Sequence, residues 1–167
     1  MLINTITKER LTAFYKNCKY LEKLKQEVEG FKKNYNFLKG SDYSATRVTS
    51  GTKKQSEEEM FVQLCERKSK EYEALKTQLE TEKENITMQI KRLTNPTYKT
   101  ILIRRYLQLK SWKEITLELY GSKDDWHIWG NTKYEILTMN LHSRARNKLI
   151  EVSQKGFLPE QRSIEGF

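Results

Sequence analysis

The stretch of the chain that decides the fold runs from Tyr98 to Val152 and reads YKTILIRRYLQLKSWKEITLELYGSKDDWHIWGNTKYEILTMNLHSRARNKLIEV. It contains a helix start at Ser111, a glycine that can end this helix at Gly121, and a basic helical pattern near its end. Two helices joined near a glycine, the second rich in Arg, Lys and Asn, are typical of a helix-turn-helix. The stretch therefore predicts a DNA-binding unit, and the chain before Asn95 is interpreted as a scaffold or a partner-binding surface.

The first helix of this stretch has signals at both ends. Ser111 and Glu114 have the spacing of a capping box, and Gly121 is the expected stop. Its buried face would be formed by Trp112, Ile115 and Leu119. Just upstream, Asn95 is a good N-cap and Pro96 suits the first helical position, so another helix is expected from there to about Leu109.

A further capping box, Thr132 with Glu135, predicts a second helix that runs to about Val152. Apolar residues recur along it at steps of about four and are expected to pack inward; they are Leu137, Leu141, Ala145, Leu149 and Val152. The remaining surface would be polar and basic, with Lys133, Asn140, Ser143, Arg144, Arg146, Asn147 and Lys148. Arg and Asn bond bidentately to guanine and adenine edges, and Ser and Lys contact phosphates. The alternative is an ordinary solvated face of an amphipathic helix.

The connection between these two helices, Ser122 to Asn131, is longer than the three or four residues of a usual helix-turn-helix turn. Its tryptophans, Trp126 and Trp129, either cap the small core, which we favour, or form a projecting loop that meets DNA or protein. Asp124 and Asp125 are a candidate metal site. Adjacent carboxylates on a polar turn are usually just solvated, and this is the favoured interpretation.

Two long helical patterns precede this stretch. The first runs from Thr5 to about Lys39, with a possible bend at Gly30, and the second starts at Ser56. Apolar residues follow each other at steps of three and four in both, but Lys68 and Glu82 interrupt the second stripe. A Ser-, Thr- and Gly-rich loop over 40–55 would join them.

We therefore expect an all-α protein in three parts: a long antiparallel, coiled-coil-like hairpin over 1–95, a small helix-turn-helix domain over 96–152 and a tail over 153–167. The second long helix would extend beyond the first, and its uncovered apolar surface would pack on the C-terminal domain or on a second copy of the chain. A homodimer is the favoured outcome.

Composition agrees with long helices better than with a large globular core, since 37% of residues are apolar and 32% are charged. The net charge of +9 suggests a polyanionic partner, although the excess is spread along the chain. Two cysteines, Cys18 and Cys65, are expected to be free thiols. With only His127 and His142 and no paired acid–base group, neither catalysis nor a cofactor is expected.

No secretory signal is recognised in Met1-Leu2-Ile3-Asn4-Thr5, and no apolar run reaches the roughly 20 residues of a membrane span. A soluble, cytoplasmic protein without a membrane partner is expected.

Three motifs carry a resemblance to the DNA-binding fourth region of bacterial sigma factors. They are Arg105-Tyr106-Leu107, Ser111-Trp112-Lys113-Glu114-Ile115 and Ser143-Arg144-Ala145-Arg146-Asn147-Lys148-Leu149. Together with the long helical first half, Leu141-His142-Ser143-Arg144-Ala145 resembles sigma-region-4-like regulators of phages and prophages of Gram-positive bacteria. The extended connection over 122–131 departs from that family's pattern.

The resemblance implies a sequence-specific transcriptional regulator, an activator of late phage genes in the bacterial host cell, bound to double-stranded DNA. Arg144, Arg146 and Lys148 would hold phosphates or bases, and Asn140, Ser143 and Asn147 would reach base edges. Lys110 and Lys113 would neutralise backbone phosphates. The long helices would supply dimerisation or a contact with host RNA polymerase.

Two rival functions remain open. The chain would instead be a helical adaptor or structural protein that binds a protein partner through its coiled coil, or a DNA-packaging subunit similar to a phage small terminase. Salt dependence separates them, because phosphate contacts weaken steeply with salt and apolar helix contacts do not.

Overall fold

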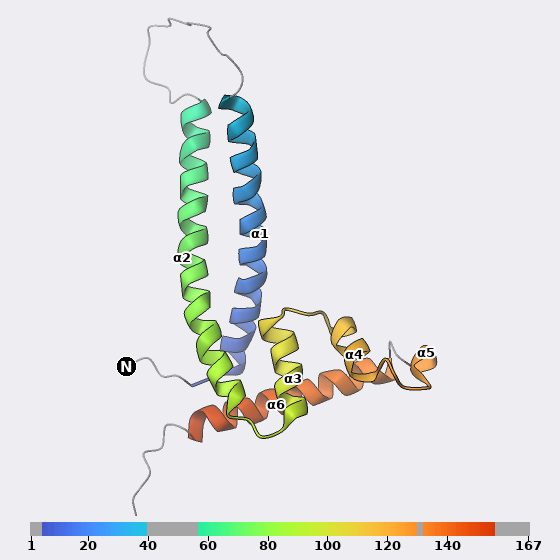
Figure 1. Cartoon of the computed structure of the whole chain (residues 1–167). Helices are drawn as coiled ribbons and strands as arrows, with labels where there is room; N and C mark the ends of the chain where they lie inside the picture. Colours follow the sequence, from blue (N-terminus) through green and yellow to red (C-terminus); the bar gives the residue numbers. More distant parts are fainter. Residues whose placement is uncertain (1–4, 40–56, 130–131, 156–167) are drawn as a thin grey trace, which may run out of the picture. The chain divides into compact units, whose positions relative to one another are not determined.

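The computed structural model describes residues 5–39, 57–129 and 132–155, without the side chains of 34–39, 57, 58 and 129 (Figure 1). Every regular element among these residues is helical, which confirms the expected all-α class. The elements are α1 (Lys8–Lys39), α2 (Glu57–Lys91), α3 (Pro96–Leu102), the π-helical turn η1 (Ile103–Leu107), α4 (Trp112–Tyr120), α5 (Trp126–Trp129) and α6 (Lys133–Lys155). The loop predicted over 40–55 and its cap at Ser56 lie outside the described residues.

The chain divides into two compact units, and both long helices contribute to each of them. Unit 2 comprises Asn17–Leu79, whereas unit 1 comprises Met1–Lys16 and Glu80–Phe167. The first turns of α1 and the last turns of α2 therefore belong to the same unit as the C-terminal helices.

Unit 2 is an antiparallel pair of helices, in which α1 and α2 lie side by side (Figure 1). The Tyr20 hydroxyl donates to Glu71 over 2.6 Å, and Lys68 forms an ion pair with Glu27 over 3.5 Å. The rings of Phe31 and Phe61 meet edge to face with centroids 5.7 Å apart. Lys68, which interrupts the apolar stripe of α2 in sequence, is thus accommodated by a carboxylate of the opposite helix.

Gly30 does not end or interrupt α1, because the helix continues through it to Lys39. A Cβ atom built on Gly30 would have no other atom within 4 Å. This half-buried glycine is therefore a weak point of an otherwise continuous helix.

Unit 1 is built around α6, which contacts α3, α4 and α5. The residues just before α1 close onto the end of α6, where the backbone N–H of Ile6 donates to Oγ of Ser153 over 3.0 Å. Arg10 holds Glu82 bidentately, through Nε at 2.5 Å and Nη2 at 2.6 Å. Glu82, the second interruption of the α2 stripe, is therefore paired across the helices as Lys68 is in unit 2.

Three of the predicted capping residues, Asn95, Ser111 and Gly121, sit where they were expected. The side chain of Asn95 accepts hydrogen bonds from the backbone N–H groups of Thr97 and Tyr98, and Pro96 follows it in the first turn of α3. Ser111 and Glu114 form a complete capping box at the start of α4. Gly121 ends α4 in a right-handed conformation, and an added Cβ there would lie 2.4 Å from the carbonyl oxygen of Leu117.

A π-helical turn and a left-handed residue separate α3 from α4. The turn η1 contains the Arg105-Tyr106-Leu107 motif. Leu109 then has a φ of 55°, and the backbone N–H of Lys110 donates back to the carbonyl of Arg104 over 3.0 Å. This closure resembles the left-handed ending common to helices, although it uses leucine where glycine is usual.

The buried face of α6 differs from the expected one. Its buried residues are Tyr134, Thr138, His142, Ala145, Leu149 and Ser153. The expectation of an inward face was wrong for Leu137, which is 41% exposed, whereas Leu141 and Val152 are half-buried. Polar residues are buried on this face instead of Leu137 because they form hydrogen bonds inside the unit, as Thr138 does with Thr116.

One further finding concerns the end of α6, and another concerns the apolar character of the helices. The final helix passes Val152 and reaches Lys155, so it includes the first residues of the segment expected to form the tail. None of the helices in the described part of the chain has the length and apolar character that crossing a membrane requires.

Candidate nucleic-acid interface

The outward face of α6 carries four exposed polar side chains, Asn140, Ser143, Arg144 and Asn147. Their spacing of three and four residues places them on one side of the helix, opposite the buried face. None of the four forms a hydrogen bond or an ion pair with another residue of the described ranges. We call these four residues the polar ridge.

Contacts with α4 fix the orientation of this ridge. The hydroxyl oxygens of Thr116 and Thr138 lie 3.0 Å apart in the buried interface between α4 and α6. The rings of Tyr120 and Tyr134 stack with centroids 5.0 Å apart. With polar and aromatic contacts at successive turns, α6 cannot rotate relative to α4, so the polar ridge faces outward.

A cluster of aromatic and charged side chains lies behind the ridge. The guanidinium of Arg105 lies between the ring of Tyr15, 4.1 Å away, and that of Trp112, 4.2 Å away. Trp112 in turn contacts the imidazole of His142, with centroids 4.8 Å apart. We call Tyr15, Arg105, Tyr106, Trp112 and His142 the aromatic cluster.

His142 is held in this cluster as a neutral imidazole. Its Nε2 lies 3.1 Å from the Tyr106 hydroxyl oxygen, and burial lowers the pKa of His142 to about 4, with the charges of Arg146 and Arg105 acting in the same direction. Burial also raises the pKa of the Tyr106 hydroxyl. Several residues of the three sequence motifs thus stabilise the unit from inside, and the polar ridge supplies the residues available to a ligand.

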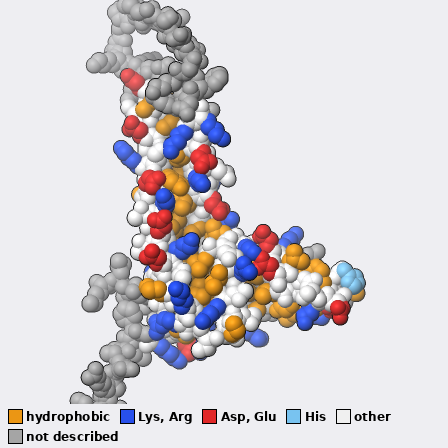
Figure 2. Space-filling view, viewed as in Figure 1, with side chains coloured by type: hydrophobic (Ala, Val, Ile, Leu, Met, Phe, Trp, Pro, Cys, Tyr) orange, Lys and Arg blue, Asp and Glu red, His pale blue; other side chains and the backbone are white. Residues whose placement is uncertain are grey.

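Three of the predicted cations are already paired within the chain. Lys110 bonds to Glu118, Lys133 lies 3.2 Å from Asp125, and Lys148 lies 2.8 Å from Glu151. Figure 2 shows basic and acidic side chains interspersed on the visible face, without one continuous basic surface. The structure therefore brings charge pairs to these positions, which the sequence alone did not reveal.

Glu151 pairs with two lysines, Lys148 and Lys155. Hydrogen bonds from Lys148 and Lys155 lower the pKa of its carboxyl to about 2. Lys113, by contrast, is exposed near the start of α4 and pairs with no carboxylate among the described residues. Of the four lysines predicted to contact DNA, Lys113 is the one without a carboxylate partner among the described residues.

Arg146 does not share the outward face. It is half-buried at the edge of α6, and its Nε is buried without a hydrogen-bond partner in the described part of the chain. Its charge opposes the rise that burial causes in the pKa of Tyr106 and adds to the fall that burial causes in the pKa of His142, which places Arg146 beside the aromatic cluster. In the sequence, Arg144 and Arg146 lie two residues apart in one basic segment and look equivalent. In the helix they point in different directions, and only Arg144 belongs to the ridge.

Apolar side chains precede the ridge on the exposed part of α6, a feature that the sequence analysis missed. Ile136 is 60% exposed and Leu137 is 41% exposed, one turn before Asn140. Other exposed apolar residues of the same unit are Met139 on α6, Leu117 on α4 and Ile128 on α5. Ile136, Asn140 and Ser143 follow each other at steps of four and three residues. This spacing could have shown from the sequence that Ile136 lies on the same face as the ridge.

The long connection packs onto α6 through an aromatic contact. Trp126 is half-buried with its ring 5.9 Å from that of Tyr134, whose hydroxyl donates to Asp125. That bond and the ion pair with Lys133 lower the pKa of Asp125. Trp126 therefore covers the core as favoured, while the side chain of Trp129 lies outside the description. No group of three or more potential metal ligands occurs among the residues that the structure describes.

Comparisons of the chain with models of protein families, with curated proteins and with solved structures gave no match. What the chain does is therefore inferred from its own residues.

Proposed function

We propose that this chain is a sequence-specific DNA-binding transcriptional regulator, of the kind that activates late genes of a bacteriophage or prophage. The observation that carries the proposal is the polar ridge: Asn140, Ser143, Arg144 and Asn147 are exposed together and have no partner within the described chain. Side chains of these types that lack internal partners are suited to hydrogen-bond an external ligand.

The chemistry of the ridge matches the edges of base pairs. The major groove admits an α-helix, Arg can bond bidentately to guanine, and Asn can bond bidentately to adenine. Ile136 and Leu137, one turn before the ridge, would offer apolar contact to thymine methyl groups. A reading surface along α6 would thus begin apolar and continue polar.

Phosphate contacts would be few, and in some of them a DNA phosphate would replace the carboxylate that now pairs with a lysine. Lys113 is free, whereas Lys110, Lys133 and Lys148 each have a carboxylate partner. Partly exposed ion pairs are worth about 0–1 kcal/mol, so a DNA phosphate can replace the carboxylate at little cost. Non-specific affinity should therefore be modest, and specificity should depend on the ridge.

The test is selection of bound fragments from a pool of genomic DNA at near-physiological salt. The wild type should enrich one site, and Arg144→Ala/Asn147→Ala should lose that enrichment with an affinity weaker by about 30-fold or more, since each of two good bidentate contacts contributes about 1–3 kcal/mol. Lys83→Ala removes an exposed charge of α2 and is the matched control. If the folded wild type enriches no site, the polar ridge is not a sequence-reading surface.

A second candidate, an adaptor that binds a protein partner, is favoured by the exposed apolar residues of α4, α5 and α6. The dependence of binding affinity on salt concentration distinguishes the two functions. DNA affinity should fall with rising salt, and Lys113→Ala should reduce the slope of log K against log salt by about one. An apolar protein contact would change little over the same range.

A further inference from the structure

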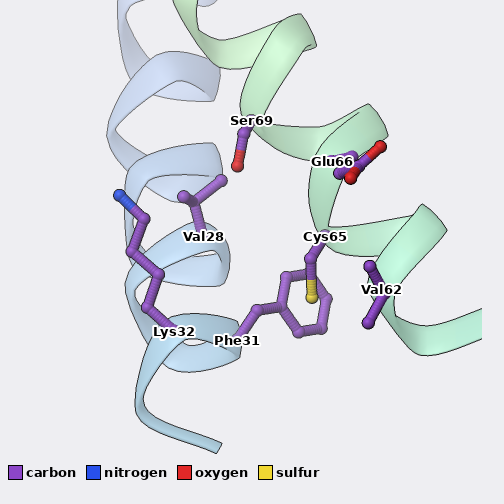
Figure 3. A pocket seen from close by; sticks show the side chains of 7 residues that line it. All are labelled: Val28, Phe31, Lys32, Val62, Cys65, Glu66 and Ser69. Carbon is purple, nitrogen blue, oxygen red and sulfur yellow. The ribbon is translucent and has the colours of Figure 1, made fainter. Parts of the chain in front are cut away.

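Unit 2 has two unlike sides. On one side, Tyr20 bonds to Glu71 and Lys68 bonds to Glu27, so polar links join the helices. The other side is hollowed. A cavity of about 440 Å³ lies there between α1 and α2, lined by Val28, Phe31, Lys32, Val62, Cys65, Glu66 and Ser69 (Figure 3).

The hollow continues along the helices as a groove. A second cavity of about 180 Å³ shares Val28, Lys32 and Ser69 with the first and extends to Lys25 and Tyr72. Figure 3 shows Val28 and Phe31 reaching from α1, and Val62 and Cys65 reaching from α2, toward the space between the helices. The floor of the groove is therefore largely apolar.

Two helices alone cannot cover this apolar surface. Among the described apolar side chains of unit 2, only Leu24, Val28 and Leu79 are buried. Others at or next to the groove remain half-buried: Leu21, Phe31, Phe61 and Val62. A stable helical bundle buries such a stripe against further helices.

The rims of the groove carry opposite charges. Lys25 and Lys32 lie on the α1 side, and Glu66 and Glu73 lie on the α2 side. Glu29, also on the α1 side, lies 3.8 Å from Lys25, and Lys76 lies 3.8 Å from Glu73. These neighbours are exposed and weaken the contrast without removing it, because exposed pairs of this kind bind loosely.

We propose that the groove holds a second copy of unit 2, and that the two copies form a four-helix bundle in which α1 of each copy lies on α2 of the other. A two-fold axis parallel to the helices produces this pairing and places the Lys39 ends of both copies at the same end of the bundle. The basic rim of each copy then faces the acidic rim of its partner. The other face-to-face arrangement, with the axis across the helices, would set α1 on α1 and bring like rims together.

The levels of the charges and the available area agree with this arrangement. Since Glu27 pairs with Lys68, Glu29 is at the level of Glu66. Lys25 and Lys32 lie on either side of Glu29, each within about one turn of Glu66 along the bundle. Unit 2 presents helices about 35 Å long in a layer about 20 Å wide. The two copies would bury on the order of 1,400 Å² in total, which is the usual size of a specific protein interface.

The first test is the molar mass of the full chain in solution, measured by sedimentation equilibrium. The chain weighs 20.0 kDa, so association should give about twice that value at micromolar concentration. Lys25→Glu/Lys32→Glu should weaken dimerisation at least tenfold, because two acidic rims would meet. Adding Glu66→Lys/Glu73→Lys to that variant should restore dimerisation, because a basic rim would again face an acidic one.

The matched control is Lys16→Glu/Lys23→Glu, which makes the same change in charge at two exposed positions of α1, also seven residues apart, on the side away from the groove. It should leave the dimer unchanged, and circular dichroism should show that every variant keeps its helices. A wild type that stays monomeric at tens of micromolar would overturn the proposal. So would a dimer that the rim variant does not weaken, since α1 would then lie on α1 or the contact would lie elsewhere.

Protection of Cys65 provides an independent readout. In Cys18→Ser protein, Cys65 in the groove should react with a maleimide several-fold more slowly above the dimer Kd than below it. Equal rates at both concentrations would contradict coverage of the groove. None of these variants touches α6, so the loss of the dimer and the loss of DNA recognition can be distinguished.

Discussion

Nε2 of His142 lies 3.1 Å from the hydroxyl oxygen of Tyr106, inside a unit where His142 is only 6% exposed. Burial lowers the pKa of His142 to about 4, below the 6.5 of an ordinary histidine. Between these values the unfolded chain binds a proton that the folded chain excludes. Stability should therefore fall as the pH is lowered from about 6.5 to 4, by on the order of 3 kcal/mol in total.

Urea unfolding between pH 7.5 and 4.5 measures this effect. His142→Gln keeps a hydrogen-bonding group for Tyr106 but does not titrate, so its stability should change much less over the same range. The comparison uses the pH slope, because the substitution also alters packing on Trp112. A variant with the wild-type slope would assign the pH dependence to another group.

Arg105 should matter more for stability than its neighbour Arg104. The guanidinium of Arg105 lies between Tyr15 and Trp112 and donates to the carbonyl of Lys110 over 3.0 Å. Arg105→Ala should cost about 2 kcal/mol and Arg105→Lys about 1 kcal/mol, since an ammonium cannot stack as a planar group does. Chemical denaturation provides the values.

Arg104→Ala is the control for this effect. Arg104 pairs with Glu118 over 2.9 Å at a partly exposed site, so its loss should cost less than about 1 kcal/mol. Equal costs at the two positions would show that the aromatic rings add nothing to the charge of Arg105.

Leu109 occupies a backbone conformation that favours other residues. Its φ of 55° is left-handed, a region that Asn and Gly enter more easily than leucine and that β-branched residues avoid. Leu109→Asn should keep the melting temperature or raise it, whereas Leu109→Ile should lower it by several degrees, about 1 kcal/mol or more. The reverse order would mean that packing of the leucine outweighs its backbone strain.

Alanine should have opposite effects at Gly30 and Gly121. A Cβ on Gly30 meets no atom within 4 Å inside a continuous helix, so Gly30→Ala should stabilise by up to about 1 kcal/mol. A Cβ on Gly121 would lie 2.4 Å from the Leu117 carbonyl oxygen, so Gly121→Ala should destabilise. Thermal unfolding of both variants checks the signs, and a gain at Gly121 would refute the steric argument.

The helix ends could be predicted from sequence because capping is local. Asn95, Ser111 and Gly121 each act on residues at most four positions away, so a short window contains all the information. The all-α class followed in the same way from repeats of three and four residues.

The buried face of α6 and the state of its cations could not be predicted in this way. Thr138, His142 and Ser153 are buried because they bond to Thr116, Tyr106 and Ile6, which lie far away in the sequence. Leucines at a four-residue step predict the core only when the distant partners of the polar residues are unknown. For the same reason Lys110 and Lys148 looked free, although each has a carboxylate beside it in the folded chain.

The bond between the N–H of Ile6 and Oγ of Ser153 also sets an order of events during translation. Unit 2 lies between Asn17 and Leu79, so all of it can leave the ribosome while the C-terminal helices are still unmade. Segments generally fold as they emerge, and the paired helices of unit 2 can therefore form first. Ile6 must wait for Ser153, so the unit that carries the polar ridge can close only after α6 has been made, later than unit 2.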